Sequence, residues 1–190
     1  MHVTGFPDVP PTRVVIPIAD MVTPLFALYG VMAPLIQRGR TGQGQHVQVS
    51  MLDCLASMMA EEHFDVPADE DAPIRTGNSH DRLVPFGTYA CSDGFVAICA
   101  FRPEWMKPLL EAMGRPELLD DPRFSSRGPR MRNAAALNGF IEAWTSSRTT
   151  EDVRRELFEE RSVPVVRVRK PKEVLNDPAL HERGAVTMLE

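Results

Sequence analysis

The chain has 190 residues, of which 43% are hydrophobic and 25% are charged, and its formal net charge at pH 7 is -5. This balance is typical of a folded globular protein of one domain or one and a half, and it argues against a disordered chain. No block of Lys or Arg is present, which argues against a nucleic-acid-binding surface, because such surfaces rely on clustered positive charge.

The cysteines and the first residues indicate a reduced, cytoplasmic setting. Cys54, Cys91 and Cys99 form no C-x-x-C pair and have no histidine at metal-ligand spacing, so they indicate neither a disulfide framework nor a zinc site. Residues 1–13 lack the basic and apolar regions of a signal peptide. We therefore expect a cytoplasmic protein without a bound metal.

Asp20 lies between two strongly apolar segments. The β-branched residues 14–16 predict a short strand, and residues 21–38, which are apolar on every face, predict a helix buried in a larger core. An aspartate at this junction can accept hydrogen bonds from the first free helix N–H groups and interacts with the positive end of the helix dipole, both of which favour its ionised form. From the residues alone, Asp20 is either a simple N-cap or a candidate for the chemistry.

The apolar helix does not have the pattern of a membrane span. A span needs about 20 apolar residues, and this helix contains Pro24, Tyr29, Gly30 and Pro34. We expect no membrane insertion. The helix must instead bury its circumference, and the first 60 residues offer only two short strands and one further helix as cover, so we expect its packing partners to lie outside this chain.

Signals for the end of this helix and for two further elements follow. Arg38, Arg40 and Gly42 predict the helix end, the alternating residues 46–50 predict a strand, and residues 50–62 predict a second helix with Ser50 as its N-cap. The glycines at 42 and 44 follow a helix and precede a strand. This order is the reverse of that in a dinucleotide-binding phosphate loop.

Residues 64–85 lose all periodicity and predict a linker between two domains. The acidic run 65–71 lacks the oxygen-ligand spacing of a calcium loop, so we expect a solvated segment and no metal site. Gly77 and Asn78 lie in this stretch and, from residue type alone, predict an ordinary turn.

The remaining residues predict a small α+β domain. Residues 87–100 predict a hairpin with a type I′ turn at Asp93-Gly94, in which Ser92 pairs with Phe95 and Cys91 with Val96. Helices are expected at 103–113, 130–144, 149–160, 173–175 and 178–183, a short turn at 117–119, and strands at 163–168 and 185–189. In the helix 149–160, which Thr150 opens, we expect Val153, Leu157 and Phe158 to point inward.

Several spaced motifs resemble the class III CoA-transferases. The two longest are PIAD at residues 17–20 and RTGQGQHVQVSMLD at 40–53. The others are at 77–80, 85–89, 92–98, 114–118, 121–124, 132–133 and 177–178. The resemblance covers nearly the whole chain.

The resemblance implies a reaction and a site. Asp20 would be the nucleophile that carries coenzyme A from an acyl-CoA donor to a small carboxylic acid acceptor, through mixed anhydrides and an aspartyl-CoA thioester. Gly77 and Asn78 would bind substrate and stabilise the oxyanions. The CoA thioester is the substrate, and no other cofactor is implied. A homodimer is expected for the full-length protein.

The resemblance also implies an α/β fold. Residues 1–63 would be part of a Rossmann-like large domain made of strand, buried helix, strand and helix. After the linker 64–85, residues 86–183 would form the small domain, and residues 184–190 would begin the return to the large domain. The chain would then be a central fragment that lacks the N-terminal CoA-binding half and the C-terminal return segment.

Two departures from the family bear on the acceptor acid more than on the fold, and two alternatives to a CoA-transferase also stay open. Pro24, which we place in the first helical turn, stands where the family often has glycine, and Ser162 to Pro164 replace a glycine-containing turn. One alternative is an α-methylacyl-CoA racemase, in which the matching aspartate acts as an acid or base with a histidine that would lie upstream of residue 1. The other is a non-catalytic remnant or binding module.

Overall fold

The computed structural model describes residues 3–63, 75–80 and 82–187. The chain divides into two compact units, Met1–Gly77 and Asn78–Glu190. Half of the predicted linker, residues 64–74, lies outside the described residues, and so does the acidic run 65–71. The linker and the domain limits proposed from the sequence therefore stay predictions.

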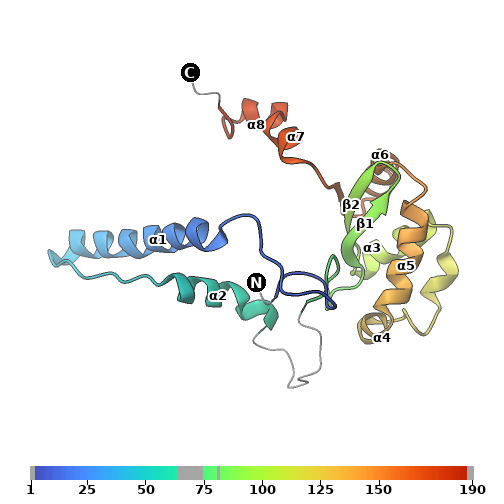
Figure 1. Ribbon diagram of the computed structural model, residues 1–190, viewed down its shortest axis with the longest axis horizontal. Coiled ribbons are helices and arrows are strands. Elements are labelled where there is room, and N and C mark those ends of the chain that lie inside the picture. Colours follow the sequence, from blue (N-terminus) through green and yellow to red (C-terminus); the bar gives the residue numbers. More distant parts are fainter. Residues whose placement is uncertain (1–2, 64–74, 81, 188–190) are drawn as a thin grey trace. The chain divides into compact units, whose positions relative to one another are not determined.

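The described part of the first unit has two helices, α1 (Ile18–Thr41) and α2 (Met51–His63), which lie side by side (Figure 1). α1 ends where the sequence predicts. Arg38 and Arg40 occupy its last turn, and Gly42 follows with φ 72°, a left-handed conformation that suits glycine. The Gly42 N–H donates to the carbonyl oxygen of Arg38 at 2.8 Å, which closes the helix end.

The two strands predicted in the first unit are wrong. Residues 14–16 and 46–50 form no strand. A strand needs a neighbour to satisfy its backbone groups, and the described residues of this unit offer none. The second segment packs against α1 instead, because a Cβ added at Gly30 would lie only 3.2 Å from Val47 Cγ1.

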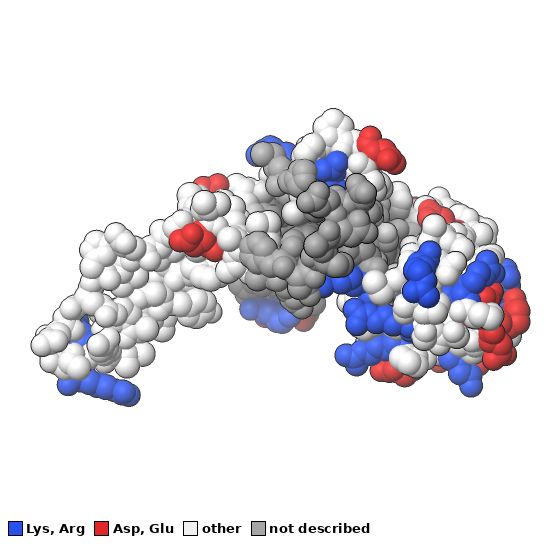
Figure 2. Space-filling view, turned by 90° about the horizontal axis from the view of Figure 1, so that it is seen from below, with Lys and Arg blue, Asp and Glu red and all other residues white. Residues whose placement is uncertain are grey.

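α1 is apolar but almost uncovered. None of its residues is buried, and Met21 and Tyr29 are 62% and 73% exposed. The surface over this unit carries few charged side chains on the face that Figure 2 shows. The expected burial of this helix is thus not found among the described residues, because α2 alone is too small to surround it.

By length and composition, α1 is also the one helix in the described part of the chain that could cross a membrane. An 18-residue window of this helix has a mean hydropathy of 1.5. Core helices of soluble proteins and signal sequences pass the same test.

The second unit is a three-stranded antiparallel sheet with short helices. The strands, in spatial order, are β1 (Phe86–Cys91), β2 (Gly94–Cys99) and β3 (Val165–Arg167). The helices are α3 (Pro103–Ala112), η1 (Pro116–Leu119), α4 (Arg127–Arg132), α5 (Ala134–Thr145), α6 (Thr150–Arg154), η2 (Arg155–Glu159), α7 (Pro171–Leu175) and α8 (Pro178–Glu182). A small α+β arrangement was expected, and the described residues of this unit have it.

The core of the second unit lies on one face of the sheet. Val96 and Ile98 of β2 are completely buried, as are Leu109, Leu137 and Ile141 of the helices. α5 packs against β1, and α6 packs against β2 and β3. On the other face, side chains such as Phe95 and Val166 are exposed.

The hairpin forms with a different turn from the predicted one. Cys91 pairs with Gly94 instead of Val96, so Ser92 and Asp93 are the turn residues. No residue from 92 to 94 has a positive φ, which rules out type I′. Contacts distant in sequence decide this turn, because the Asp93 carboxylate accepts the Thr150 N–H at 2.7 Å.

Two details of the predicted helices are also corrected. The helix expected at 130–144 is divided at Asn133, whose φ of -114° and ψ of 24° are not helical. Thr149, not Thr150, caps α6 by accepting the Asp152 N–H at 3.1 Å. Phe158 is 54% exposed although its neighbour Leu157 is fully buried, because successive residues of a helix point in different directions around its axis.

The later elements mostly agree with the sequence. β3 lies inside the predicted strand 163–168, and α7 and α8 overlap the two predicted helical pieces. Residues 185–187 do not form the strand that was predicted over 185–189, and residues 188–190 lie outside the described part.

Truncating Leu137 to alanine should destabilise the second unit by about 2–5 kcal/mol, because this α5 side chain is fully buried and its loss leaves a cavity. Urea denaturation followed by tryptophan fluorescence measures the effect, since both tryptophans, Trp105 and Trp144, belong to this unit. The control is Leu175→Ala, at a side chain that is 57% exposed, which should change the unfolding free energy by less than about 0.5 kcal/mol. Equal losses in both variants would contradict this core.

Candidate functional site

Asp20 is an exposed residue in the first turn of α1. The helix begins at Ile18, and Pro17 occupies the N-cap position without a side-chain hydrogen bond, so the interpretation of Asp20 as the N-cap is wrong. Within the described residues, the Asp20 carboxylate accepts no hydrogen bond and forms no ion pair. An unpaired carboxylate near the positive end of a helix is available as a nucleophile.

The helix is irregular directly after Asp20. Pro24 lies inside α1 and not in its first turn, so it cannot supply the N–H that would normally bond the Asp20 carbonyl oxygen. The Thr23 hydroxyl donates to the Ala19 carbonyl oxygen at 2.7 Å. The Asp20 carbonyl oxygen, next to the candidate nucleophile, therefore lacks the hydrogen bond that residue 24 would normally donate in a helix.

Gly77 has a structural partner for its N–H group. This N–H donates to the Gly5 carbonyl oxygen at 3.0 Å, and the residue has φ 65°. A Cβ at this position would lie 2.5 Å from Cδ1 of Phe6. Both the conformation and the space thus require glycine here.

Asn78 belongs to the second unit, where its carbonyl oxygen accepts the Thr88 N–H at 2.8 Å. No hydrogen bond among the described residues joins Asp20 to Gly77. The assignment of Gly77 and Asn78 to substrate binding therefore stays a prediction.

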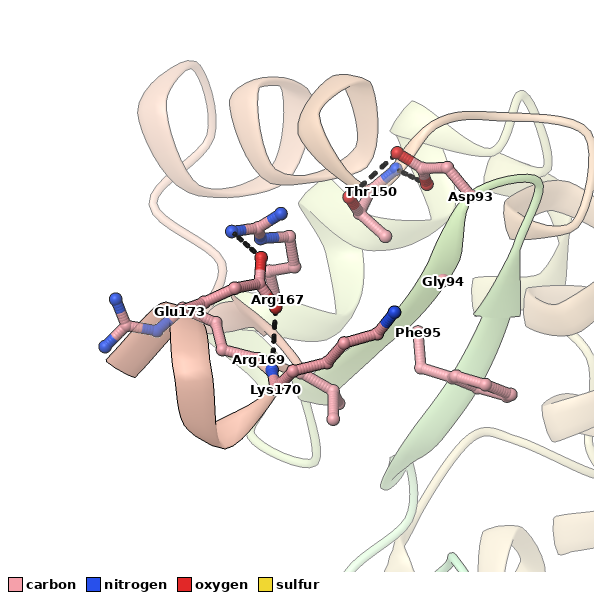
Figure 3. Close-up of a pocket in the computed structure, with 9 residues that line it drawn as sticks. Asp93, Gly94, Phe95, Thr150, Arg167, Arg169, Lys170 and Glu173 are labelled. Carbon is pink, nitrogen blue, oxygen red and sulfur yellow. Dashed lines mark hydrogen bonds and ion pairs between the residues drawn. The ribbon is translucent and has the colours of Figure 1, made fainter. Parts of the chain in front are cut away.

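The second unit has an open pocket of about 600 Å³ (Figure 3). Asp93, Gly94, Phe95, Thr150, Arg167, Val168, Arg169, Lys170 and Glu173 line it. Three of these side chains are basic and two are acidic. Lys170 extends toward Gly94 and Phe95 in Figure 3.

Most charges around this pocket are neutralised within the protein. Arg167 forms an ion pair with Glu173 at 2.9 Å, and Arg169 pairs with Asp177. The Asp93 carboxylate holds the N-terminus of α6 through Thr150. The Thr150 hydroxyl donates to the Asp93 carboxylate at 3.3 Å, and Thr150 is buried, so this pair serves to hold the helix end. The pocket offers space for a small anion. Sequence reasoning missed it, although the basic residues at 167, 169 and 170 were a possible signal.

No cysteine of the described residues is a good nucleophile. Cys54 is buried. Burial, and secondarily the charge of Asp93, raises the pKa of Cys91 to about 11, and burial also raises the pKa of Cys99. The described residues contain no group of three His, Cys, Asp or Glu side chains that could hold a metal ion.

Cys91 should react slowly with iodoacetamide at pH 8. A pKa of about 11 in place of 9.0 lowers the thiolate fraction roughly a hundredfold, and the thiolate is the reacting form. Peptide mass spectrometry of alkylated protein measures this rate. The chain unfolded in urea is the control, in which Cys91 should react at an ordinary rate; rapid alkylation of folded protein would contradict the raised pKa.

A sequence profile of CoA-transferase family III matches residues 1–190. The chain is 34% identical over 187 residues to the succinyl-CoA:mesaconate CoA-transferase of Haloarcula hispanica. It is 35% identical over 185 residues to the succinyl-CoA--D-citramalate CoA-transferase of Chloroflexus aurantiacus. These matches cover 98% and 97% of this chain but only 46% of each relative.

Comparison with solved structures also finds a relative of which this chain covers about half. A CAIB/BAIF family protein from Brucella suis superimposes with a TM-score of 0.75 and is 32% identical in sequence. The match covers 97% of this chain and 48% of the Brucella protein. The chain thus spans about half the length of the relatives that it matches.

Proposed function

Because this chain belongs to CoA-transferase family III, we propose that the protein containing it transfers coenzyme A from an acyl-CoA donor to a carboxylic acid acceptor. The observation that carries the proposal is the family match over all 190 residues. The Haloarcula and Chloroflexus relatives are named as CoA-transferases, which supports transfer over the racemase alternative.

The substrates proposed here are succinyl-CoA and a small dicarboxylic acid. Related enzymes are named for succinyl-CoA with mesaconate, D-citramalate or glutarate, and another is named for acetyl-CoA with oxalate. All four acceptor acids carry two carboxylates. A dicarboxylate is therefore the acceptor class with most support.

Asp20 is the proposed nucleophile. Its carboxylate would attack the thioester carbonyl of the donor, form a mixed anhydride and release the CoA thiolate. The thiolate would then attack the aspartyl carbonyl, form the aspartyl-CoA thioester and release the donor acid. The acceptor carboxylate would reverse these two steps, leaving as its CoA thioester and restoring Asp20. The exposed and unpaired state of the Asp20 carboxylate supports this role, because a carboxylate needs no base to act as a nucleophile.

Each attack on a carbonyl group produces a tetrahedral intermediate with an oxyanion, which needs hydrogen-bond donors. One well-placed donor stabilises such an oxyanion by about 3 kcal/mol. Gly77 and Asn78 remain the proposed substrate-binding residues from this chain. Since the Gly77 N–H is bonded to Gly5, Gly77 would need to release that bond to act as a donor. Its neighbour Asn78 has an exposed side chain that would need no such change.

The larger assembly is also a proposal. Residues 1–63 would complete a Rossmann-like large domain, with 64–85 as linker, 86–183 as small domain and 184–190 as the start of the return. The exposed apolar surface of α1 supports this, because a core helix that lacks its neighbours has such a surface. A homodimer in the cytoplasm fits the family resemblance and the three free cysteines.

The test is a transfer assay on the whole protein in which this chain occurs. Succinyl-CoA is mixed with mesaconate, citramalate, glutarate or oxalate, and mass spectrometry detects the new CoA thioester. We expect one dicarboxylate to be converted, and a monocarboxylate such as acetate serves as control. Folded protein that forms no new thioester from any pair would refute the proposal.

A further inference from the structure

A single guanidinium group holds the loop that precedes α1. Arg75 Nε donates to the Phe6 carbonyl oxygen at 3.1 Å, and its Nη2 donates to the carbonyl oxygens of Pro7 and Val9 at 3.2 and 2.9 Å. These partners lie 66 to 69 residues away in sequence. The planar guanidinium presents its donors in a fixed geometry, so three bonds to one loop define the shape of that loop.

Gly77 adds a second attachment to the same loop. Its N–H bonds the Gly5 carbonyl oxygen, and the Phe6 ring occupies the space next to its Cα. The Thr12 N–H donates to the Thr4 carbonyl oxygen at 3.0 Å and closes the loop at its base. Residues 4–12 are therefore fixed from both sides.

The loop is joined to α1 by a short connection. Only residues 13–17 lie between the loop and Ile18, and the last of them is Pro17, whose ring restricts φ to about -65°. The Met21 N–H donates to the Pro17 carbonyl oxygen at 3.0 Å, which makes Pro17 part of the first helical turn. A change in the loop would therefore move the start of the helix that carries Asp20.

We propose that Arg75 is a positioning residue for Asp20, acting through the loop of residues 4–12. This inference rests on the proposed function of Asp20 as the nucleophile. Arg75 itself takes no part in bond making. Its guanidinium fixes the direction from which α1 starts, and small errors of position at a reacting group can cost about a hundredfold in rate.

The test compares Arg75→Ala and Arg75→Lys with Arg13→Ala, at an exposed arginine of the same unit whose side chain has no hydrogen bond to any described residue. The first measurement is amide hydrogen exchange at Thr12 and Gly77, which needs no turnover. We expect exchange to become about tenfold faster or more in both Arg75 variants and to stay unchanged in the Arg13 variant. The Lys variant keeps the charge but lacks the planar guanidinium that directs donors to all three carbonyl oxygens.

The second measurement is the rate of Asp20 acylation in the whole protein. We expect kcat to fall roughly a hundredfold in Arg75→Ala with little change in KM, and added methylguanidinium to restore part of the rate. Unchanged hydrogen exchange in the Arg75 variants would show that Arg75 does not hold the loop of residues 4–12, and the inference would be wrong. Faster exchange with a normal acylation rate would overturn the positioning role while leaving Asp20 as nucleophile. If unsubstituted protein is never acylated, the proposed function fails, and the inference fails with it, whatever the exchange data show.

Discussion

Replacing Asp20 with asparagine is expected to abolish CoA transfer, by roughly four orders of magnitude or more, while leaving the fold intact. The amide cannot form the anhydride or the thioester, so the covalent route is closed. The side chain is exposed and has no bonded partner within the described residues, so the change should cost at most about 1 kcal/mol of stability, mainly through the helix dipole. Steady-state transfer rates of the whole protein and of its Asp20→Asn variant measure the loss of activity. Thermal unfolding of the same two proteins measures the change in stability.

Trapping distinguishes a nucleophile from a residue that only supports the site. Hydroxylamine added during turnover should convert acylated Asp20 into a hydroxamate, visible as a modified peptide by mass spectrometry. Asp53→Asn is the matched control, because Asp53 is also an exposed carboxylate in the first turn of a helix. It should keep full activity. An Asp20→Asn protein with a nearly normal rate would remove Asp20 from the mechanism.

Local signals in the sequence predicted the elements that depend on neighbouring residues. Gly42 ends α1 because the left-handed conformation is needed there, and Arg38 and Arg40 precede it as expected. The strands of the hairpin follow from their apolar pattern. The predicted pairing of the two strands was wrong by two residues, since Val96 pairs with Tyr89 and not with Cys91. Every side chain still lies on its predicted face of the sheet, because strand side chains alternate with a period of two.

Local sequence patterns could not predict contacts between residues that are distant in the sequence. The Asp93 carboxylate binds Thr150, 57 residues later, and so selects the turn. Residues 14–16 have the composition of a strand but no neighbour among the described residues of their unit, and composition alone does not reveal that. Gly77 was recognised as a turn residue, yet the Phe6 ring that requires a glycine there has no local signature.

In the candidate site, too, one residue was found from the sequence and another only from the structure. Family motifs around Asp20 point to the nucleophile, and no periodicity could have done so. Nothing in the sequence near Arg75 indicates that its side chain bonds three carbonyl groups of the N-terminal loop. A long side chain with several donors can act across a great sequence distance, so such a residue is found only from coordinates.

The 190-residue chain by itself is expected to self-associate and to show no transferase activity. α1 exposes a row of large apolar side chains that includes Leu28 and Met32, and soluble monomers rarely leave such a continuous surface uncovered. Each buried Å² of apolar surface contributes about 25 cal/mol, so association through α1 is favourable. Light scattering should give a mass well above the 21.2 kDa of one chain.

Charge placed on α1 should reverse this association. Leu28→Glu with Met32→Glu puts two carboxylates on one side of the helix, one turn apart, and they would repel each other across any shared interface. Phe158→Glu is the matched control, because Phe158 and Leu28 are both 54% exposed but Phe158 lies in the second unit. We expect the α1 variant to shift toward monomer and the Phe158 variant to remain associated. A monodisperse monomer of the unsubstituted chain with measurable transfer activity would show instead that α1 needs no further cover, and the proposed large domain would then have lost its main support.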